Sequence, residues 1–212
     1  MKDYDFAATA PSVRYKLLVG SVVPRPIALV TTVDAAGNVN AAPYSFFNVL
    51  SHDPAVVALG IERRPDGRPK DTVHNIDLNG EFVVNLVDEA MGPGMNICAA
   101  DFEPGIDELV VAGFAAAPSL KVRPPRIAQA PVALECRLLQ DVRLGADNKR
   151  AILLGEVLAL RIREDLVDPA NDRVDTARMA LIGRLAASDY VRLTDRYAMP
   201  RVSAADLAAK KA

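Results

Sequence analysis

The chain has 212 residues, half of them hydrophobic and a quarter charged, with a formal net charge of −2. This balance is typical of a single soluble domain (1–212) that buries a core without disulfide or metal staples, and its scattered basic residues argue against nucleic-acid binding. No apolar run approaches the roughly 20 residues that span a bilayer. The N-terminus lacks the basic-then-apolar pattern of a signal peptide, so we expect a cytoplasmic protein without a membrane segment.

The first part of the chain predicts one short helix and then strands, over 12–19, 27–33, 39–45 and 55–61. Ser12 is the expected N-cap of the helix, and Gly37-Asn38 supplies the turn between the first two strands. Pro43 is expected to end ladder pairing because proline has no amide proton to donate. Residues 44–48 would then leave the sheet as an irregular polar and aromatic rim.

The rest of the chain inserts short helices between strands. Helices are predicted over 71–78, 96–102, 106–112 and 203–211, and strands over 82–87, 133–144, 151–162 and 178–184. Asp71 is the expected cap of the second helix, and Gly80 lies just past its end. Because helices and strands do not alternate as β-α-β units, the pattern favours an antiparallel barrel over a doubly wound sheet. No glycine-rich dinucleotide or nucleotide-phosphate motif is present.

The inventory of reactive side chains is small. Cys98 and Cys136 lack any metal-ligand spacing, and His52 and His74 are the only histidines. This predicts no zinc site, and a disulfide is unexpected in a reducing compartment. We therefore expect two free thiols and no metal.

Three segments could carry chemistry. Residues 44–48 (YSFFN) offer amide, hydroxyl and aromatic groups that suit a planar heterocycle, although Phe46 and Phe47 as core residues are the simpler explanation. Lys70 opens a predicted helix, where free amides and the dipole attract phosphate, but an ordinary surface helix would look the same. Arg184 and Tyr190 could reach a ligand or decorate the end of a strand. The residues alone do not decide among these alternatives.

Taken in order, these segments resemble the flavin reductase-like family of FMN-binding split barrels, the group that includes flavoredoxin. The matching stretches are RPIALVTT (25–32), Gly37-Asn38, APYSFFN (42–48), Ser51 with DP at 53–54, KDT and NI within 70–76, GEFVVNL (80–86), and LIGRL with DY within 181–190. Their order and spacing carry the resemblance, since each motif is short.

The resemblance implies a mainly β fold, a six-stranded antiparallel Greek-key split barrel with peripheral short helices. It also implies FMN held non-covalently near the interface of a homodimer. The flavin ring and ribityl chain would contact Thr31, Thr32, Ser45, Phe46, Phe47 and Asn48. The phosphate would contact Ser51, Lys70 and Thr72, with Arg64 and Arg184 as further additions. Independently, the strands 55–61 and 82–87 are apolar almost throughout, so both faces need cover, and a second subunit is the simplest source.

The implied function is a flavin-dependent oxidoreductase that transfers reducing equivalents from NADH or NADPH to flavin, with a monooxygenase or electron-transfer protein as partner. One alternative is an FMN-bound electron carrier without its own NAD(P)H site. Another is a pyridoxamine-phosphate-oxidase-like barrel or a binding module without turnover, which the APYSFFN and KDT stretches disfavour. The flavin itself supplies the chemistry, so no catalytic residue is assigned, and His74 is best explained as a solvated helix residue.

Overall fold

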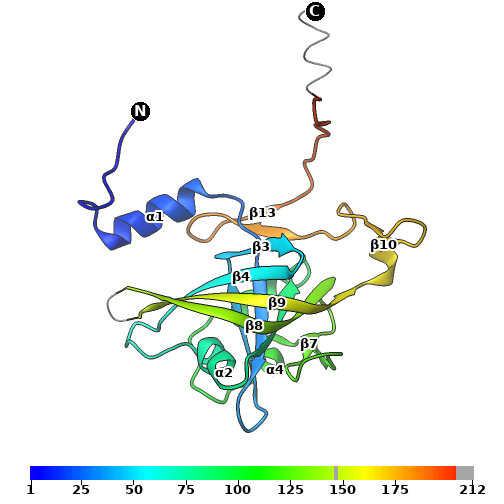
Figure 1. The fold of residues 1–212 in the computed structure, drawn as a ribbon, viewed down its shortest axis with the longest axis horizontal. Helices are drawn as coiled ribbons and strands as arrows, with labels where there is room; N and C mark the ends of the chain where they lie inside the picture. Colours follow the sequence, from blue (N-terminus) through cyan, green and yellow to red (C-terminus); the bar gives the residue numbers. More distant parts are fainter. Residues whose placement is uncertain (146–147, 204–212) are drawn as a thin grey trace, which may run out of the picture.

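The computed structural model describes residues 1–145 and 148–203. Its main body is a seven-stranded antiparallel sheet in the order β2-β1-β5-β8-β9-β4-β3 (Figure 1). The strands are β1 (Ala28–Val33), β2 (Val39–Tyr44), β3 (Phe47–His52), β4 (Ala55–Glu62), β5 (Glu81–Leu86), β8 (Val132–Leu144) and β9 (Arg150–Ile162). The predicted 133–144 and 151–162 hairpin is confirmed as β8 and β9.

Four helices and several short ladders surround this sheet. The helices are α1 (Pro11–Ser21), α2 (Asp71–Asn79), α3 (Gly92–Ile97) and α4 (Glu108–Ala112). The short elements are β6 (Ala116–Ala117), β7 (Arg126–Ile127), η1 (Glu164–Leu166), β10 (Val167–Asp168), β11 (Arg173–Val174), β12 (Ile182–Arg184) and β13 (Tyr190–Arg192). α1 lies beside β3 and β13 on one side of the barrel, and α2 lies on the opposite side (Figure 1).

The sheet closes on itself because of its shortest connection. β2 and β3 are the two edge strands, yet only Ser45 and Phe46 separate them in sequence. A two-residue link cannot cross the face of an open seven-stranded sheet, so the edges must approach each other. The Gly60 amide on β4 donates to the Phe46 carbonyl at 2.7 Å and ties this link to the barrel wall. The predicted antiparallel barrel is confirmed, with one strand more than expected.

The extra strand, β3, contains the segment expected to be irregular. Pro43 does not end pairing: it lies opposite Leu29 in the β1–β2 ladder. Proline is tolerated there because β2 is an edge strand and the missing amide need not face a partner. β3 escaped detection because most of its side chains are exposed, so it has no alternating apolar pattern. The irregular rim is therefore only Ser45 and Phe46.

Two of the three hydrophobic clusters among the described residues lie on either side of β1. Inside the barrel, Val30, Phe82 and Leu153 are fully buried, and Val73 and Ile76 of α2 close one end. Outside it, the opposite faces of β1 and its neighbours pack against the α3 and α4 region and β7, through a second cluster formed by Leu29, Val87, Met91, Met95, Leu109 and Ile127. The chain itself thus covers the outer side of β1 and, at Val87, the end of the predicted strand 82–87, whereas this cluster contains no residue of the predicted strand 55–61.

Several predicted boundaries shift. Ser12 lies inside α1, which begins with Pro11, a residue whose missing amide suits the first helical position. Asp71 does not cap α2; Lys70 occupies the N-cap position, while Gly80 ends the helix in a left-handed conformation as expected. The predicted strand 178–184 shortens to β12, and helix 96–102 begins earlier, at Gly92. Apart from Ser203, the predicted terminal helix 203–211 lies outside the described residues.

Within 1–145 and 148–203, no helix is long and apolar enough to cross a membrane. The same ranges hold no group of three or more histidine, cysteine or acidic side chains that could bind a metal ion.

Candidate flavin site

Two hollows lie on either side of the β2–β3 link. The first, called here the large cavity, has a volume of about 880 Å³ and lies between α1 and the Ser45–Asn48 segment. The second, the polar pocket, has about 80 Å³ and lies at the start of α2. Residues near the ends of β2 and β4 line both hollows: Tyr44 and Arg64 line the polar pocket, whereas Ser45 and Glu62 line the large cavity. An elongated ligand with a small polar end could extend from one to the other.

A buried arginine shapes the large cavity. Arg25 is only 8% exposed and donates to the carbonyls of Val19 and Val22 at the end of α1, at 2.6 and 2.9 Å. It also donates to the Leu185 carbonyl at 2.9 Å and to Ser45 Oγ at 3.3 Å. Burial lowers the pKa of Arg25. The arginine therefore joins α1, the C-terminal segment and the cavity wall without any carboxylate partner in the described chain.

This contact orients Ser45 toward a ligand. Because Ser45 Oγ accepts from Arg25, its hydroxyl proton remains to be donated, and the described residues provide no acceptor for it. The Ser45 side chain is half-buried in the cavity wall. It can therefore donate to a carbonyl or ring nitrogen of a bound molecule. Arg25 was included only in the matching stretch 25–32, and its residue type alone does not reveal that it holds Ser45.

Phe46 and Phe47 could each be a core residue or a ligand contact, and the structure places them differently. Phe47 is 8% exposed and packs in the barrel core, as its core explanation required. Phe46 is 43% exposed and lies at the large cavity. Asn48 is exposed beside it and accepts a hydrogen bond from the Val49 amide at 2.8 Å. All four residues from Ser45 to Asn48 are brought together at one wall.

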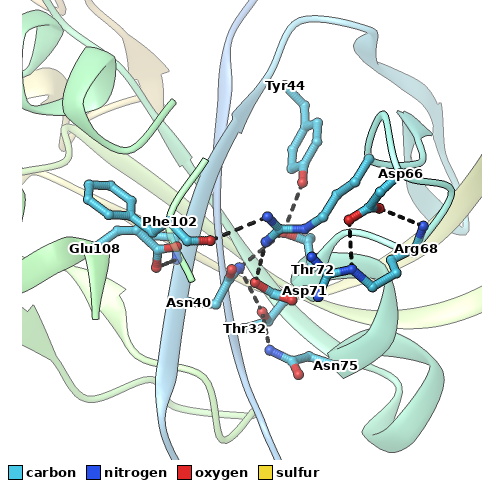
Figure 2. A network of polar contacts seen from close by, with 12 residues as sticks. Thr32, Asn40, Tyr44, Asp66, Arg68, Asp71, Thr72, Asn75, Phe102 and Glu108 are labelled. Atoms are coloured by element: carbon cyan, nitrogen blue, oxygen red, sulfur yellow. Dashed lines mark hydrogen bonds and ion pairs between the residues drawn. The ribbon is translucent and has the colours of Figure 1, made fainter. Parts of the chain in front are cut away.

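At the polar pocket, Thr72 belongs to a buried network (Figure 2). Its Oγ1 accepts from Asn40 Nδ2 at 3.0 Å and from Tyr44 Oη at 2.9 Å, and the residue is 1% exposed. Burial raises the pKa of Tyr44 well above its ordinary value. The Thr72 side chain thus links the start of α2 to β2. The group of Thr72 that could still bind a ligand is its backbone amide.

The cations of the polar pocket are differently placed. Arg64 pairs with Asp71 at 2.7 Å and donates to the Phe102 carbonyl at 3.3 Å (Figure 2). Lys70 lines the same pocket, and its ammonium forms no hydrogen bond or ion pair with any described residue. No described side chain caps α2, so its first amides are available to an anion. Lys70 and the helix start fit a phosphate group.

Thr31 and Thr32 face the protein instead of a ligand. Both are fully buried. Thr31 Oγ1 donates to the Pro125 carbonyl at 2.5 Å, and Thr32 Oγ1 accepts from Asn40 and Asn75 at 3.2 and 3.0 Å. Their side chains position the strands around the site.

The remaining residues of the predicted site lie apart from it. Ser51 pairs with Val56 near the start of β4, away from the end of β4 that approaches the polar pocket, and it lines neither hollow in the described chain. The Arg184 guanidinium donates to the Ala187 carbonyl and stacks over Tyr190, 4.5 Å from its centroid. His74 is exposed on α2. One chain therefore does not gather Ser51, Lys70 and Thr72 around a single phosphate.

Sequence analysis missed a buried carboxyl at the polar pocket. Glu108 is 7% exposed, and its Oε2 accepts from the Ala41 amide at 2.8 Å. Burial raises the pKa of Glu108. The pKa of nearby Cys98 is raised to about 12, mainly by its own burial and further by the Glu108 carboxyl. No sequence signal could have shown this, because Glu108 follows an ordinary helix cap, Asp107.

The fold is an antiparallel barrel, and the site combines a large cavity with aromatic side chains in its lining and a small polar pocket that contains Lys70. A family model described as "Flavin reductase like domain" matches residues 19–178. The chain belongs to this flavin reductase-like family, so it is a flavin-related redox protein, as the sequence motifs predicted.

Individual proteins give the same result. A protein from Deinococcus radiodurans is 43% identical over 206 residues, with 94% of this chain and 89% of the relative covered. The structure of Pseudomonas fluorescens 2-nitrobenzoate 2-nitroreductase NbaA superposes with a TM-score of 0.87 at 36% identity, covering 96% of this chain and 98% of the other. Nitrilotriacetate monooxygenase component B from Bacillus cereus gives 0.89 at 31% identity, covering 94% and 98%.

Proposed function

We propose that the protein is an FMN-dependent oxidoreductase that transfers reducing equivalents from NADH or NADPH to flavin. The observation that carries the proposal is that the two hollows are lined by neighbouring residues at the β2–β3 link, Tyr44 for the polar pocket and Ser45 for the large cavity. An uncapped helix start and an unpaired Lys70 lie at one end, and a hydroxyl donor on an apolar wall lies at the other. FMN has the matching parts: a phosphate, a flexible chain and a flat ring with hydrogen-bonding edges. Similar proteins named as a nitroreductase and a monooxygenase component support a redox role.

In this proposal the bound flavin supplies hydride acceptance, and the chain binds and orients it. Lys70 and the first amides of α2 hold the phosphate. Ser45, held by Arg25, donates its hydroxyl proton to an acceptor on the ring edge. Phe46 shields the ring from water at the cavity wall.

The test is anaerobic mixing of the FMN-loaded protein with NADH or NADPH while the flavin absorbance is followed. Bleaching by either nucleotide, at a rate that saturates with its concentration, is the expected result. Dithionite should bleach the same sample as a control. A flavin that dithionite reduces and neither nucleotide reduces would replace this proposal with the electron-carrier alternative. A monooxygenase that accepts the reduced flavin is the partner we propose.

We also propose a homodimer. Edge strand β3 exposes Val49 and Leu50 by 58% and 60%, and β9 exposes Leu160 by 58%. Val49 and Leu160 border a further apolar hollow of about 470 Å³. A second copy would cover these side chains, and an FMN that touches both copies would raise dimer stability by mass action. Sedimentation of FMN-free protein across dilution, with and without FMN, tests this. A monomer that binds FMN with unchanged affinity would refute it.

A further inference from the structure

The large cavity contains an arginine whose charge has no partner. Arg14 projects from α1 into the cavity lining, and its Nε is buried without a hydrogen-bond acceptor. No described residue forms an ion pair or hydrogen bond with this side chain. A buried N–H without an acceptor costs about 1–3 kcal/mol, more for a charged group. A ligand that brings an acceptor to Arg14 would remove that cost.

The other charges of the cavity are already satisfied. Arg25 donates four hydrogen bonds, three to carbonyls and one to Ser45. Arg150 pairs with Glu62 at 2.8 Å, and both line the same cavity. Arg14 therefore remains as the one charged side chain of the described lining without a hydrogen bond or ion pair. This arrangement fits a ligand that brings an anionic group to Arg14.

The walls near Arg14 define the rest of the ligand. Phe6, Tyr15 and Phe46 all line the cavity, and they remain 38%, 55% and 43% exposed. Three partly exposed aromatic rings around one hollow offer faces and edges on which a planar ring can stack. The volume of about 880 Å³ is at the upper end of small-molecule sites and leaves room beside a flavin ring.

We propose that the large cavity binds an aromatic monocarboxylate, whose carboxylate pairs with Arg14 while its ring lies against Tyr15 and Phe6. Guanidinium and carboxylate match in planar, two-pronged geometry, which makes this pairing stronger than a neutral hydrogen bond. The inference rests on the proposed function only in that flavin, where bound, occupies the Ser45–Asn48 side of the same cavity. It deepens that function by naming the class of small molecule admitted next to the flavin.

The experiment measures binding of benzoate and of its neutral analogue benzamide by calorimetry, to FMN-free and to FMN-loaded protein. Wild-type protein should prefer benzoate, and Arg14→Gln should weaken benzoate by roughly tenfold or more while benzamide changes little. Lys16→Gln is the matched control: Lys16 lies on the same helix and is exposed, and it does not line the cavity. This control should bind benzoate like the wild type.

Each other outcome is decisive. Equal loss of benzoate in Arg14→Gln and Lys16→Gln would show a general charge effect and overturn the proposal. If Arg14→Gln weakens NADPH and leaves benzoate unchanged, the anion is a nucleotide phosphate and the proposal fails. FMN affinity, measured separately by fluorescence, keeps the two proposals apart. Arg14-dependent benzoate binding without FMN binding would sustain this inference and refute the proposed function, whereas FMN binding without benzoate binding would do the reverse.

Discussion

In the polar pocket the Thr72 hydroxyl is buried among the protein's own groups and accepts hydrogen bonds from Asn40 and Tyr44. In the large cavity the Ser45 hydroxyl is half-buried in the wall, and the Arg14 guanidinium has no partner in the described chain. Both regions lie beside the same β2–β3 link, and sequence analysis placed a ligand at both. The difference shows that residue type in a motif does not identify a ligand contact. What identifies it is the hydrogen-bonding capacity left after the protein's own contacts are formed.

Lys70 and Thr72 show the same difference within the polar pocket. Lys70 is two residues from Thr72 in sequence and lines the same hollow, yet its ammonium is unpaired among the described residues while the Thr72 side chain is buried. We therefore expect substitution of Thr72 to lower the stability of the fold, and substitution of Lys70 to lower the affinity for FMN. The predictions below begin with the largest expected effect.

Thr72→Val should lower the free energy of unfolding by roughly 2–4 kcal/mol, because two buried donors, from Asn40 and Tyr44, lose their shared acceptor. Thr72→Ser should recover most of this loss because it restores the hydroxyl. Urea unfolding measures both, with exposed Thr194→Val as the matched control. Unchanged stability together with a large loss of FMN affinity would show that Thr72 binds the phosphate after all.

Lys70→Ala should weaken FMN binding by roughly 1.5–3 kcal/mol, the range for a hydrogen bond to a charged group, and leave stability unchanged. Riboflavin lacks the phosphate, so its affinity should not change. Fluorescence titration measures both ligands, and exposed Lys121→Ala serves as the control. If Lys70→Ala weakens riboflavin as much as FMN, the phosphate does not lie at the start of α2.

Glu108→Gln should flatten the dependence of stability on pH. Burial raises the folded-state pKa of Glu108, so the folded protein holds this proton more tightly than the unfolded chain. The resulting stability is complete below the ordinary carboxyl pKa of about 4.3 and is lost as pH rises through the raised value. Glutamine can still accept from the Ala41 amide without that loss.

Unfolding of wild type and Glu108→Gln across this pH window measures the difference, with exposed Glu164→Gln as the control. Relative to the wild type, Glu108→Gln should become more stable as pH rises. A constant difference at every pH would mean that Glu108 does not titrate in this window.

Much of the fold follows from local pattern. The β8–β9 hairpin and the α2 end at Gly80 were predictable because long apolar strands and a helix-ending glycine act through neighbours in sequence. β3 was not, because an exposed edge strand has no periodicity to detect. The prediction that Pro43 ends ladder pairing was wrong because proline is tolerated in an edge strand. Which strands lie at the edge is fixed only by the closed barrel.

The site was predictable only in part, for a related reason. Ser45 and Phe46 were found because both stand in one contiguous motif that also forms the cavity wall. The burial of Thr31 and the distinct contacts of Arg25 depend on partners such as Pro125 and Leu185, which are distant in sequence. Arg14 carried no motif at all, since an arginine on a short helix looks the same whether it is solvated or enclosed.

The smallest expected effect concerns the two thiols, whose only hydrogen bonds among the described residues are long contacts to the backbone carbonyls of Glu108 and Leu134. Cys98 and Cys136 are buried, and burial raises both pKa values, that of Cys98 to about 12. A protonated, enclosed thiol is a poor nucleophile and should not react with a thiol reagent at pH 8 in the folded protein. Both should react in denaturant. The Cys98→Ala, Cys136→Ala double variant should lose some stability from lost packing but bind FMN unchanged. Rapid labelling of the native protein, or loss of flavin binding without unfolding, would show that a cysteine takes part in the site.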